Sequence, residues 1–512
     1  MTISRRGLKP RYELNKYTMS KYMNLPQKGS MGYLYGIVAV AVLGGLLFGY
    51  DTAVISGAEK GLQAFFSGAG DFTYTDTMHG ITSSSALIGC IIGSALSGFF
   101  ASRFGRKRSL LIAGVFFFVS ALGSYCPEFL FFEHGKPSLS LLYMFNFYRI
   151  IGGVGVGLAS AVCPMYIAEV APADKRGALV SWNQFAIIFG QLVVYVVNTL
   201  ILGDHLQPTV EQIAHLSFPA EAQWTVETGW RYMFGSEAFV AGAFIVLVCF
   251  VPMSPRFLAM KGRDEQALYV LARINGVAKA REILSDIKAT TSVKNERLFS
   301  FGIMVVFVGI MLSVFQQAIG INAVLYYAPR IFESMGMGNP MVQTVIMGVI
   351  NIAFTVLAIF TVERWGRKPL LITGSIGMAV GAFGVALPNL VALPPVVSVA
   401  AIMIYSACFM FSWGPICWVL ISEIFPNTIR SAAIAIAVAF QWIFNFIVSS
   451  TFIPMYNMKV GGMDNFGHVF TYALYGVICI LAAWFVLKLV PETKGKTLEQ
   501  MTGYWRKRGN KA

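Results

Sequence analysis

The chain has 512 residues, of which 56% are hydrophobic and only 12% are charged, against about 25% in ordinary soluble domains. So few charged side chains cannot cover the surface of a soluble protein of this length. The formal net charge of +14 would suit a nucleic-acid-binding protein, so its distribution along the chain matters more than its size. Composition excludes a soluble protein and predicts an integral membrane protein.

Apolar stretches of roughly 20 residues recur along the whole chain, each long enough to cross a bilayer as a helix. A membrane β-barrel would instead show short segments of alternating polarity. The sequence therefore predicts an all-α polytopic membrane protein. Its twelve transmembrane helices are expected at residues 33–55, 78–100, 109–126, 140–164, 178–202, 231–252, 301–327, 342–362, 369–389, 396–421, 432–453 and 467–490.

The basic residues lie almost entirely on one side of the predicted membrane. They gather at the termini, in RFGRKR (103–108), in residues 253–300 and in RWGRK (364–368). This asymmetry follows the positive-inside rule and predicts that both termini are cytoplasmic. It explains the net charge without a nucleic-acid partner. The exceptions are Lys60, Lys136, Arg330 and Lys459, which are predicted on the other side, and Arg149 and Arg231, which lie within or at the edge of spans.

Two motifs repeat along the chain. ASRFGRKR (101–108) returns as VERWGRKP (362–369) after 261 residues, and YIAEVAPADKRGA (166–178) returns as LISEIFPNTIRSA (420–432) after 254. Two unrelated motifs repeating at nearly one offset predict two pseudo-symmetric six-helix halves. We expect an N-terminal cytoplasmic extension (1–32), an N-terminal half (33–252), a cytoplasmic helical linker (253–300), a C-terminal half (301–490) and a cytoplasmic tail (491–512).

A carboxylate stands within the first span, in LLFGYDTAVISG (46–57). An ionised Asp51 in hydrocarbon costs several kcal/mol unless it has a partner, so it is either paired or functional. Arg149 in the fourth span is the expected cation, and Glu237 in the sixth span is a second acidic candidate. A static ion pair between two helices is one interpretation. We favour proton coupling, in which protonation of Asp51 releases Arg149. Phe48, one turn away, is expected on the same helix face.

Amide and aromatic side chains gather in spans of both halves. Gln184 and Gln191 are seven residues apart and therefore share one face of the fifth helix. Amides that donate and accept suit sugar hydroxyls, and aromatic rings suit the apolar face of a pyranose. The alternative is hydrogen bonding between helices, worth about 0.6 kcal/mol each, which a cluster in both halves disfavours. Further members of the cluster are Trp418, Gln441, Trp442 and Asn445.

The seventh span carries three more amides, Gln316, Gln317 and Asn322. They do not share a face of a straight helix. Gly320 between them offers a position where the helix can break, and a broken helix could bring all three around a ligand.

The RFGRK and RWGRK loops, the paired Glu and Arg of the repeated motifs, FQQAIGIN (315–322) and PETKGKT (491–497) together resemble the sugar porter branch of the major facilitator superfamily. The resemblance extends from Gly32 to Thr497. It implies alternating access to a midplane site, with import of a monosaccharide, D-xylose before glucose, coupled to proton symport in a bacterial inner membrane. The implied sugar contacts are Gln184, Gln191, Gln316, Gln317, Asn322, Tyr326, Asn351, Gly414, Trp418 and Gln441, with Phe48 and Trp442 closing the pocket.

The resemblance also implies a cytoplasmic gate of charged residues. We expect ion pairs between the halves that hold the outward-open state and break in the inward-open state. Charge that only sets topology is the alternative, but it leaves the repeated glutamates unexplained. Two departures put the gate in doubt: Met253 replaces the usual glutamate of PESPR, and Ser431 replaces the usual glycine after Arg430. The expected gate residues are Arg103, Arg106, Glu169, Arg176, Arg364, Arg367, Glu423 and Arg430.

Other functions are less well supported by the sequence. A facilitative uniporter is the main alternative, because facilitative relatives carry an uncharged residue at the position of Asp51. A transporter-like sugar sensor usually needs a longer tail than the one after Thr497. We find no nucleophile–base pair for an enzyme, and no metal or cofactor site. The expected partners are a monosaccharide, the proton as coupling ion and membrane lipid, with the protein acting as a monomer.

Overall fold

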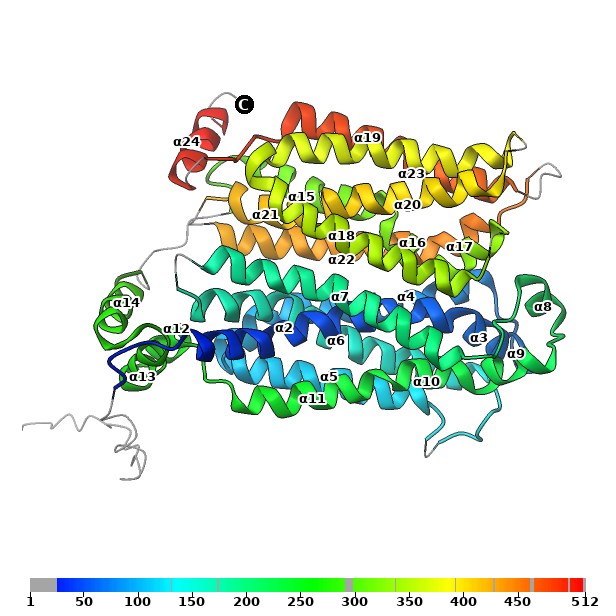
Figure 1. Cartoon of the computed structure of the whole chain (residues 1–512), viewed down its shortest axis with the longest axis horizontal. Helices are drawn as coiled ribbons and strands as arrows, with labels where there is room; N and C mark the ends of the chain where they lie inside the picture. Colours follow the sequence, from blue (N-terminus) through cyan, green and yellow to red (C-terminus); the bar gives the residue numbers. More distant parts are fainter. Residues whose placement is uncertain are drawn as a thin grey trace, which may run out of the picture.

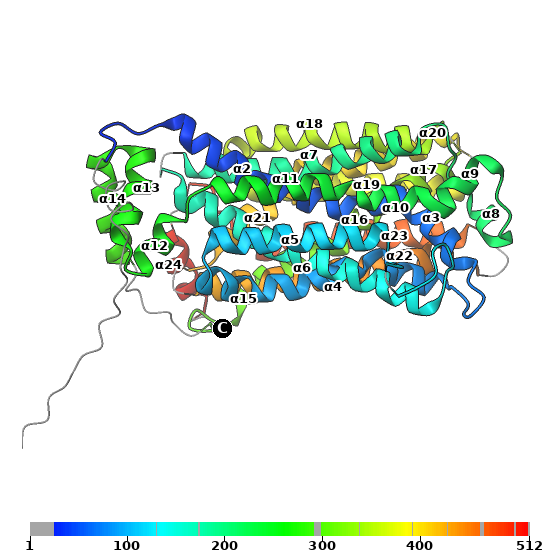
Figure 2. The same cartoon turned by 90° about the horizontal axis from the view of Figure 1, so that it is seen from below.

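The protein is a long bundle of helices that run along one axis (Figures 1 and 2). The computed structural model describes residues 25–512 except 130, 173–174, 291–297, 337, 392, 427–428, 461–464, 496–497 and 510–512. Most of the expected extension over residues 1–32 lies outside the described residues. Twelve helices are long and apolar enough to cross a membrane, which confirms the predicted number. The chain is a multi-pass membrane protein.

The first half contains six spans and the short helices of its loops. Its elements are α2 (Met31–Ala53), α3 (Ile55–Ser67), α4 (Asp76–Arg103), α5 (Arg106–Tyr125), α6 (Leu139–Val170), α7 (Arg176–Leu202), α8 (Val210–His215), α9 (Ala220–Trp224), the π-helical turn η1 (Thr225–Gly229), α10 (Trp230–Gly235) and α11 (Glu237–Phe250).

Three helices outside the bundle separate this half from the second one. They are α12 (Pro255–Met260), α13 (Asp264–Asn275) and α14 (Val277–Thr290). The second half then consists of α15 (Ile303–Ala318), α16 (Ile321–Tyr326), α17 (Ala328–Ser334), α18 (Pro340–Trp365), α19 (Arg367–Ala386), the 3₁₀ turn η2 (Leu387–Asn389), α20 (Pro395–Phe411), α21 (Trp413–Ile424), α22 (Arg430–Tyr456), α23 (Phe466–Leu489) and the terminal helix α24 (Leu498–Gly509).

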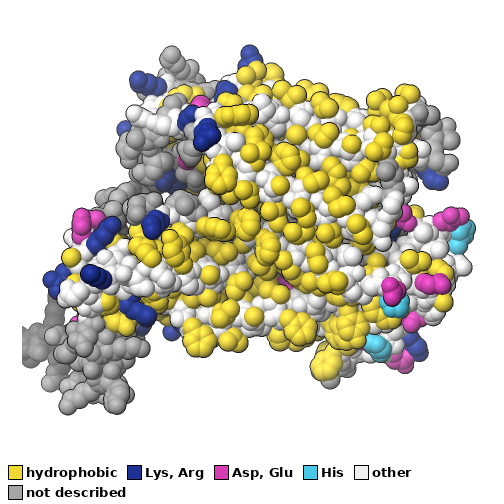
Figure 3. Space-filling model, in the orientation of Figure 1, with side chains coloured by type: hydrophobic (Ala, Val, Ile, Leu, Met, Phe, Trp, Pro, Cys, Tyr) yellow, Lys and Arg dark blue, Asp and Glu magenta, His cyan; other side chains and the backbone are white. Residues whose placement is uncertain are grey.

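The two ends of the bundle differ in chemistry. Helices α12–α14 and α24 lie at one end, which we call the basic end, and α8 and α9 lie at the other, the opposite end (Figures 1 and 2). Hydrophobic side chains cover the length between them, while Lys and Arg mark the basic end (Figure 3). Large apolar side chains such as Phe239 and Phe250 are 84% and 80% exposed in this band. Such a band matches the hydrocarbon of a bilayer.

The two halves meet along α4 with α22 and along α7 with α18. Small residues allow these helices to approach closely, as is usual in membrane bundles. A Cβ added at Gly80 of α4 would lie 2.2 Å from the backbone oxygen of Ser450 in α22. Glycine is therefore required at this contact between the halves.

The repeated motifs form equivalent turns at the basic end. Gly105 separates α4 from α5 with a φ of 83°, and Gly366 separates α18 from α19 with a φ of 93°. These left-handed conformations strain any residue with a Cβ. The glycine of RFGRK and RWGRK is thus explained by the turn that each motif makes.

The first, seventh and tenth spans are each interrupted. The first continues past its predicted end through α3 to Ser67. The seventh breaks at Gly320, where φ is +88°, into α15 and α16, as predicted. The tenth is divided at Ser412 into α20 and α21. At each interruption the helix changes direction, and this changes which side chains meet inside the bundle.

Candidate functional site

A cavity of about 640 Å³, including its opening to solvent, lies between the two halves. Every expected sugar contact except Asn351 lies in its wall. The lining residues are Phe48, Thr52, Gln184, Ile187, Ile188, Gln191, Gln316, Gln317, Asn322, Leu325, Tyr326, Phe409, Met410, Gly414, Trp418, Gln441, Trp442 and Asn445.

The N-terminal half contributes α2 and α7 to the wall. Gln184 and Gln191 both face the cavity, in agreement with their predicted shared face. Phe48 of α2 approaches Trp442 of α22, with ring centroids 5.5 Å apart. This aromatic pair spans the two halves beside the amides, where it can cover a flat apolar ligand face.

The broken seventh span provides the amide network of the other wall. Nε2 of Gln316 donates to the backbone oxygen of Trp413 at 3.0 Å, and its Oε1 accepts from Gln441. Beyond the break, Nδ2 of Asn322 donates to Oε1 of Gln317 at 2.6 Å. The left-handed residue between α15 and α16 turns these amides toward each other.

Several polar atoms of the wall have no partner in the described chain. They are Oε1 of Gln191, Oε1 of Gln441 and Nε1 of Trp442. Buried polar atoms are normally hydrogen-bonded, so free acceptors and a free donor in a cavity indicate a site for a polar ligand. A neutral polyol can satisfy both kinds through its hydroxyl groups.

Asn351 does not line this cavity, contrary to its expected role. It is 1% exposed on α18, and its Oδ1 accepts a hydrogen bond from Oγ of Ser406 in α20 at 2.7 Å. The residue holds two helices of the C-terminal half together. Sequence spacing cannot distinguish such an interhelical amide from one that faces a ligand.

The structure adds residues that the sequence analysis did not assign to the site. Thr52 follows Phe48 by one turn and faces the cavity with it. Thr52 could have been predicted from the sequence, because residues four apart share one face of a helix. The remaining additions are apolar, and no sequence signal separated them from ordinary core residues: Ile187, Ile188, Leu325, Phe409 and Met410.

Asp51 is paired with Arg149, as the sequence predicts. Nη1 of Arg149 lies 2.6 Å from Oδ1 of Asp51, and Nη2 donates to the backbone oxygen of Asp51 at 3.0 Å. The side chains are 3% and 0% exposed. Oδ2 of Asp51 and both carboxyl oxygens of Glu237 have no hydrogen-bond partner among the described residues. The pair therefore leaves buried acceptors available to a proton.

Phe48 and Asp51 are three residues apart on α2, but only Phe48 lines the cavity. Phe48 and Thr52 line the cavity, whereas Asp51 is absent from its wall and contacts α6. Three residues turn a helix by roughly 300°, which leaves the two side chains about 60° apart, so Asp51 can meet α6 while Phe48 faces the cavity. The ion pair and the cavity are adjacent on α2 but separate.

Ion pairs of the expected cytoplasmic gate lie within the halves. Arg106 binds Glu169 at 2.7 Å in the first half, and Arg367 binds Glu423 at 2.9 Å in the second. Nε of Arg430 donates to a backbone oxygen of its own half, that of Phe425, at 3.4 Å. The side chains of Arg103, Arg176 and Arg364 are exposed. Pairing between the halves at this end stays a prediction.

The PETKGKT motif binds the start of α19. The Glu492 carboxylate accepts hydrogen bonds from the backbone N–H groups of Arg367, Lys368, Thr493 and Lys494, at 2.9 to 3.1 Å. Burial raises the pKa of Glu492, but these four donors lower it by more, so its pKa lies below the usual value. A carboxylate is well placed at the positive end of a helix.

The first half lacks this carboxylate, because Met253 occupies the corresponding position. The correspondence is set by the next residue: Ser254 donates to Glu169 as Thr493 donates to Glu423. A Cβ added at Gly105 would lie 2.7 Å from the ring of Phe257, so an aromatic ring covers the turn before α5 instead. Ser431 lies in α22, and its side chain is outside the described residues.

Three potential metal ligands lie together in the loop before α6. Ligand atoms of Cys126, Glu128 and His134 are within 4.8 Å of one another. Glu128, however, is bound by the guanidinium of Arg231, with one contact of 2.7 Å. That pairing commits the carboxylate, so we assign no metal to this loop.

The family model for "sugar (and other) transporter" matches residues 37–505. The chain belongs to this sugar transporter family. It is 47% identical to the D-xylose-proton symporter of Escherichia coli (strain K12) over 486 residues, which cover 92% of this chain and 96% of that protein. It is 37% identical to the glucose facilitated diffusion protein of Zymomonas mobilis over 490 residues, which cover 94% of this chain and 99% of that protein.

A solved structure matches the fold along nearly the whole chain. The inward open conformation of the xylose transporter XylE from E. coli has a TM-score of 0.80 at 46% identity, covering 92% of this chain and 100% of that one. The two six-helix halves thus form the fold of the major facilitator superfamily. Its members in the comparisons are transporters, which agrees with the prediction that this chain is not an enzyme.

Proposed function

We propose that this protein is a secondary active transporter that imports D-xylose together with a proton by alternating access. The observation that carries the proposal is a buried Asp51–Arg149 pair whose carboxylate lies on the same helix, α2, as two residues of a cavity lined by amides. An intramembrane acid beside a substrate site is a typical element of proton-driven transport. The 47% identity to a D-xylose-proton symporter supports the same substrate and ion.

The cavity supplies the sugar site. Amides on α7, α15, α16 and α22 bind hydroxyl groups, and Phe48 with Trp442 covers the apolar face of the ring. The sugar contacts both halves at once, so binding favours states in which the halves close around it. None of the described residues that line the wall is charged, which favours a neutral ligand over an anionic one.

The ion pair supplies the coupling. A proton on Asp51 cancels the charge that holds Arg149, and the guanidinium is then free to rearrange between α2 and α6. Glu237 presents two further unpaired oxygens in the buried interior of the same half, where its protonation state affects the pair electrostatically. The proton is the only coupling ion that the proposal requires.

The charge asymmetry supports an orientation in a bacterial inner membrane. By the positive-inside rule the basic end, with α12–α14 and α24, faces the cytoplasm. The similarity to an inward open structure then corresponds to a cavity that communicates with the cytoplasm. The protein acts as a monomer with membrane lipid around the apolar band.

Uncoupled transport is the alternative function, which the higher identity to a proton symporter disfavours. The relative from Zymomonas mobilis is named a facilitated diffusion protein, so this family includes transport without an ion gradient. The substitution Asp51→Asn distinguishes the two functions because it removes the titratable group and leaves the cavity wall intact.

The test uses purified protein in proteoliposomes. With an imposed inward proton gradient, the wild type accumulates labelled D-xylose above the external concentration, and a protonophore abolishes the accumulation. Asp51→Asn still exchanges sugar across an equilibrated membrane but does not accumulate it. Accumulation by Asp51→Asn would contradict the coupling, and competition by unlabelled pentoses and hexoses tests the substrate.

A further inference from the structure

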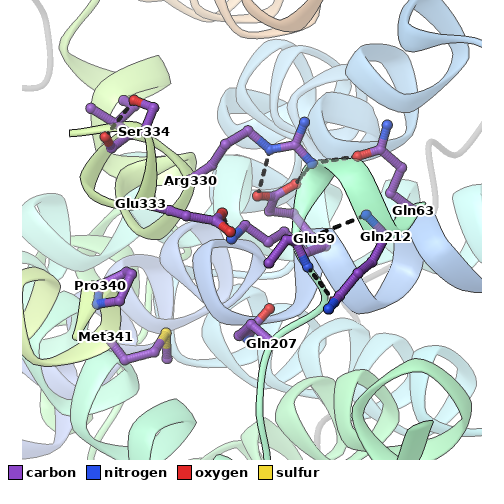
Figure 4. Close-up of polar contacts among 12 residues, drawn as sticks. Glu59, Gln63, Gln207, Gln212, Arg330, Glu333, Ser334, Pro340 and Met341 are labelled. Carbon is purple, nitrogen blue, oxygen red and sulfur yellow. Dashed lines mark hydrogen bonds and ion pairs between the residues drawn. The ribbon is translucent and has the colours of Figure 1, made fainter. Parts of the chain in front are cut away.

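Two ion pairs cross between the halves at the opposite end of the bundle. Arg330 binds Glu59 (Figure 4), and Lys60 binds Glu333. Glu59 and Lys60 lie on α3, which continues the first span. Arg330 and Glu333 lie on α17, which follows the broken seventh span. Each ion pair therefore joins the two halves. We call these four residues the inter-half latch.

The Arg330–Glu59 contact is buried and has two hydrogen bonds. Nε of Arg330 lies 3.0 Å from Oε1 of Glu59, and Nη2 lies 2.8 Å from Oε2. The side chains are only 2% and 1% exposed. Gln63, one turn further along α3, accepts another hydrogen bond from Nη2. Paired geometry of this kind compensates buried charge better than a single contact.

Neutral groups complete the surroundings of Glu59. His79 of α4 contacts Oε2 of Glu59 at 3.0 Å through Nε2, and its Nδ1 lies 3.2 Å from the hydroxyl of Tyr74. A neutral imidazole satisfies both contacts by donating to Glu59 and accepting from Tyr74. The nearby Asp76 carboxylate accepts a hydrogen bond from Asn457, the residue after α22, at 2.8 Å, which adds another contact between the halves.

The order of charge on the two helices is complementary. On α3 the acid Glu59 precedes the base Lys60, and on α17 the base Arg330 precedes the acid Glu333 by one turn. A slide of α17 along α3 would bring like charges together. The latch therefore defines one register between the two helices.

Helix α17 is also connected to the sugar cavity. It follows α16 after the single residue Tyr327, and α16 carries Asn322 and Tyr326 in the cavity wall. Separation of α17 from α3 consequently moves the segment that carries two cavity residues. The same segment thus links closure at the opposite end to the shape of the site.

We propose that the inter-half latch holds the opposite end closed and sets the equilibrium between states closed and open at that end. Breaking the contacts in opening transfers four charges to water, so the strong pairing in the closed state is balanced by solvation in the open state. Such an interface is bistable, because both arrangements satisfy the charges and intermediate ones do not. This inference uses the alternating access of the proposed function but neither the identity of the sugar nor the proton.

The latch also accounts for two basic residues that depart from the charge asymmetry. Lys60 and Arg330 are predicted on the side of the membrane that carries few basic residues, and the structure buries both against carboxylates. Unpaired buried cations would be costly, so their retention requires partners.

The test measures the distance between spin labels at the opposite end. Cysteines replace Tyr143 at the start of α6 and Val396 at the start of α20, one in each half and both exposed. The seven native cysteines are replaced first. Pulsed electron spin resonance then reports the fractions of short and long distances in detergent or nanodiscs.

Removing one charge should open this end. In Glu59→Gln or Arg330→Gln the remaining charge is buried without its ionic partner, so we expect the open-to-closed ratio to rise by about tenfold or more. The double variant E59Q/R330Q leaves no unpaired charge of this pair and should return toward the wild-type ratio. Lys60→Gln should act in the same direction as the two single variants.

The matched control is Glu133→Gln, because Glu133 forms an exposed pair with Lys136 at the same end. It should leave the distances unchanged. Unchanged distances in all three single variants would overturn the latch. It would also be overturned if the open-to-closed ratio of E59Q/R330Q rose by the combined effect of the two single substitutions. If the distances shift as expected while D-xylose is not transported, the latch stands and the proposed substrate fails.

Discussion

Individual atoms separate two kinds of buried amide in this protein. Oε1 of Gln191 faces the cavity without a partner, whereas Oδ1 of Asn351 accepts a hydrogen bond from Ser406. Both residues are amides in predicted spans, and the sequence assigns both to the sugar site. Only the direction of each side chain decides whether it serves a ligand or the packing of two helices.

These two residues lead to opposite expectations for alanine variants. Gln191→Ala should weaken D-xylose binding about fivefold, because a lost hydrogen bond to a ligand hydroxyl is worth roughly 1 kcal/mol, and should barely change thermal stability. Asn351→Ala should lower thermal stability and leave the dissociation constant within about twofold. Binding is measured by tryptophan fluorescence or calorimetry, and unfolding by thermal denaturation in detergent. A reversed pattern would show that the two positions have been assigned to the wrong roles.

The pair of Asp51 and Arg149 shows which contacts of single residues can be predicted from the sequence. Asp51 and Arg149 are predictable as partners, because each is an isolated charge in an apolar span and needs the other. Their separation from the cavity is not predictable, since α2 turns Phe48 and Asp51 toward different neighbours. The sequence identifies the buried charged groups that need a partner. The packing of the helices decides whether each group faces a neighbouring helix or the cavity.

At the scale of the elements, the break in the seventh span positions the amide network. Gly320 has a φ of +88°, and a Cβ there would lie 2.4 Å from the ring of Tyr475. Both the backbone conformation and the contact require glycine. The break is visible in the sequence because Gln317 and Asn322 cannot share one face of an unbroken helix.

Gly320→Ala should destabilise the protein and weaken sugar binding, since the strain and the clash displace α16 from α15. We expect a loss of about 1–3 kcal/mol in unfolding free energy from the backbone strain alone, with the clash in addition. Gly336→Ala is the matched control: its φ is +68°, but no atom lies within 4 Å of an added Cβ. Thermal unfolding and D-xylose binding of the two variants are compared. Equal losses in both would show that contact with Tyr475 does not matter.

The binding of Glu492 at the start of α19 gives a second prediction at this scale. Because its pKa in the folded protein lies below the usual value, its stabilisation is complete above about pH 4.5 and is lost as pH falls through the folded-state pKa. Glu492→Gln should therefore lower stability at pH 7 by about 1–2 kcal/mol, and the difference from wild type should shrink on acidification. Denaturation at several pH values measures this.

Glu282→Gln provides the control for that experiment. Glu282 is exposed on α14, and such a substitution should change stability by less than about 0.5 kcal/mol at any pH. A difference between Glu492→Gln and wild type that stayed constant down to acid pH would contradict the titration of this carboxylate.

At the scale of the whole molecule, charge and apolar surface divide the protein into two ends and a band. The basic end carries both the linker helices and α24 (Figure 1). Composition predicts this division without a structure, because hydrophobic length and the positive-inside rule depend on sequence order alone.

The predicted orientation can be tested with single cysteines at the two ends. A cysteine at Met260 in α12 should be labelled by an impermeant thiol reagent only in inverted membrane vesicles, because the basic end is expected in the cytoplasm. A cysteine at Val396 in α20 should be labelled only in right-side-out vesicles. Both positions are half-exposed, at 50% and 52%. Labelling with the opposite sidedness would reverse the orientation.

By itself the sequence determined the membrane class, the number of spans, the two repeated halves and the need for a partner at Asp51. These follow from hydrophobic length, repeat offset and the cost of isolated charge, which are properties of residue order. Only the tertiary structure decided that Asn351 supports packing, that Glu492 and not Met253 carries a carboxylate to a helix start, and that Lys60 and Arg330 pair with carboxylates of the other half. The reason is that these contacts join residues 55 to 273 positions apart. A buried polar group takes its role from whichever atom the fold places within about 3 Å of it.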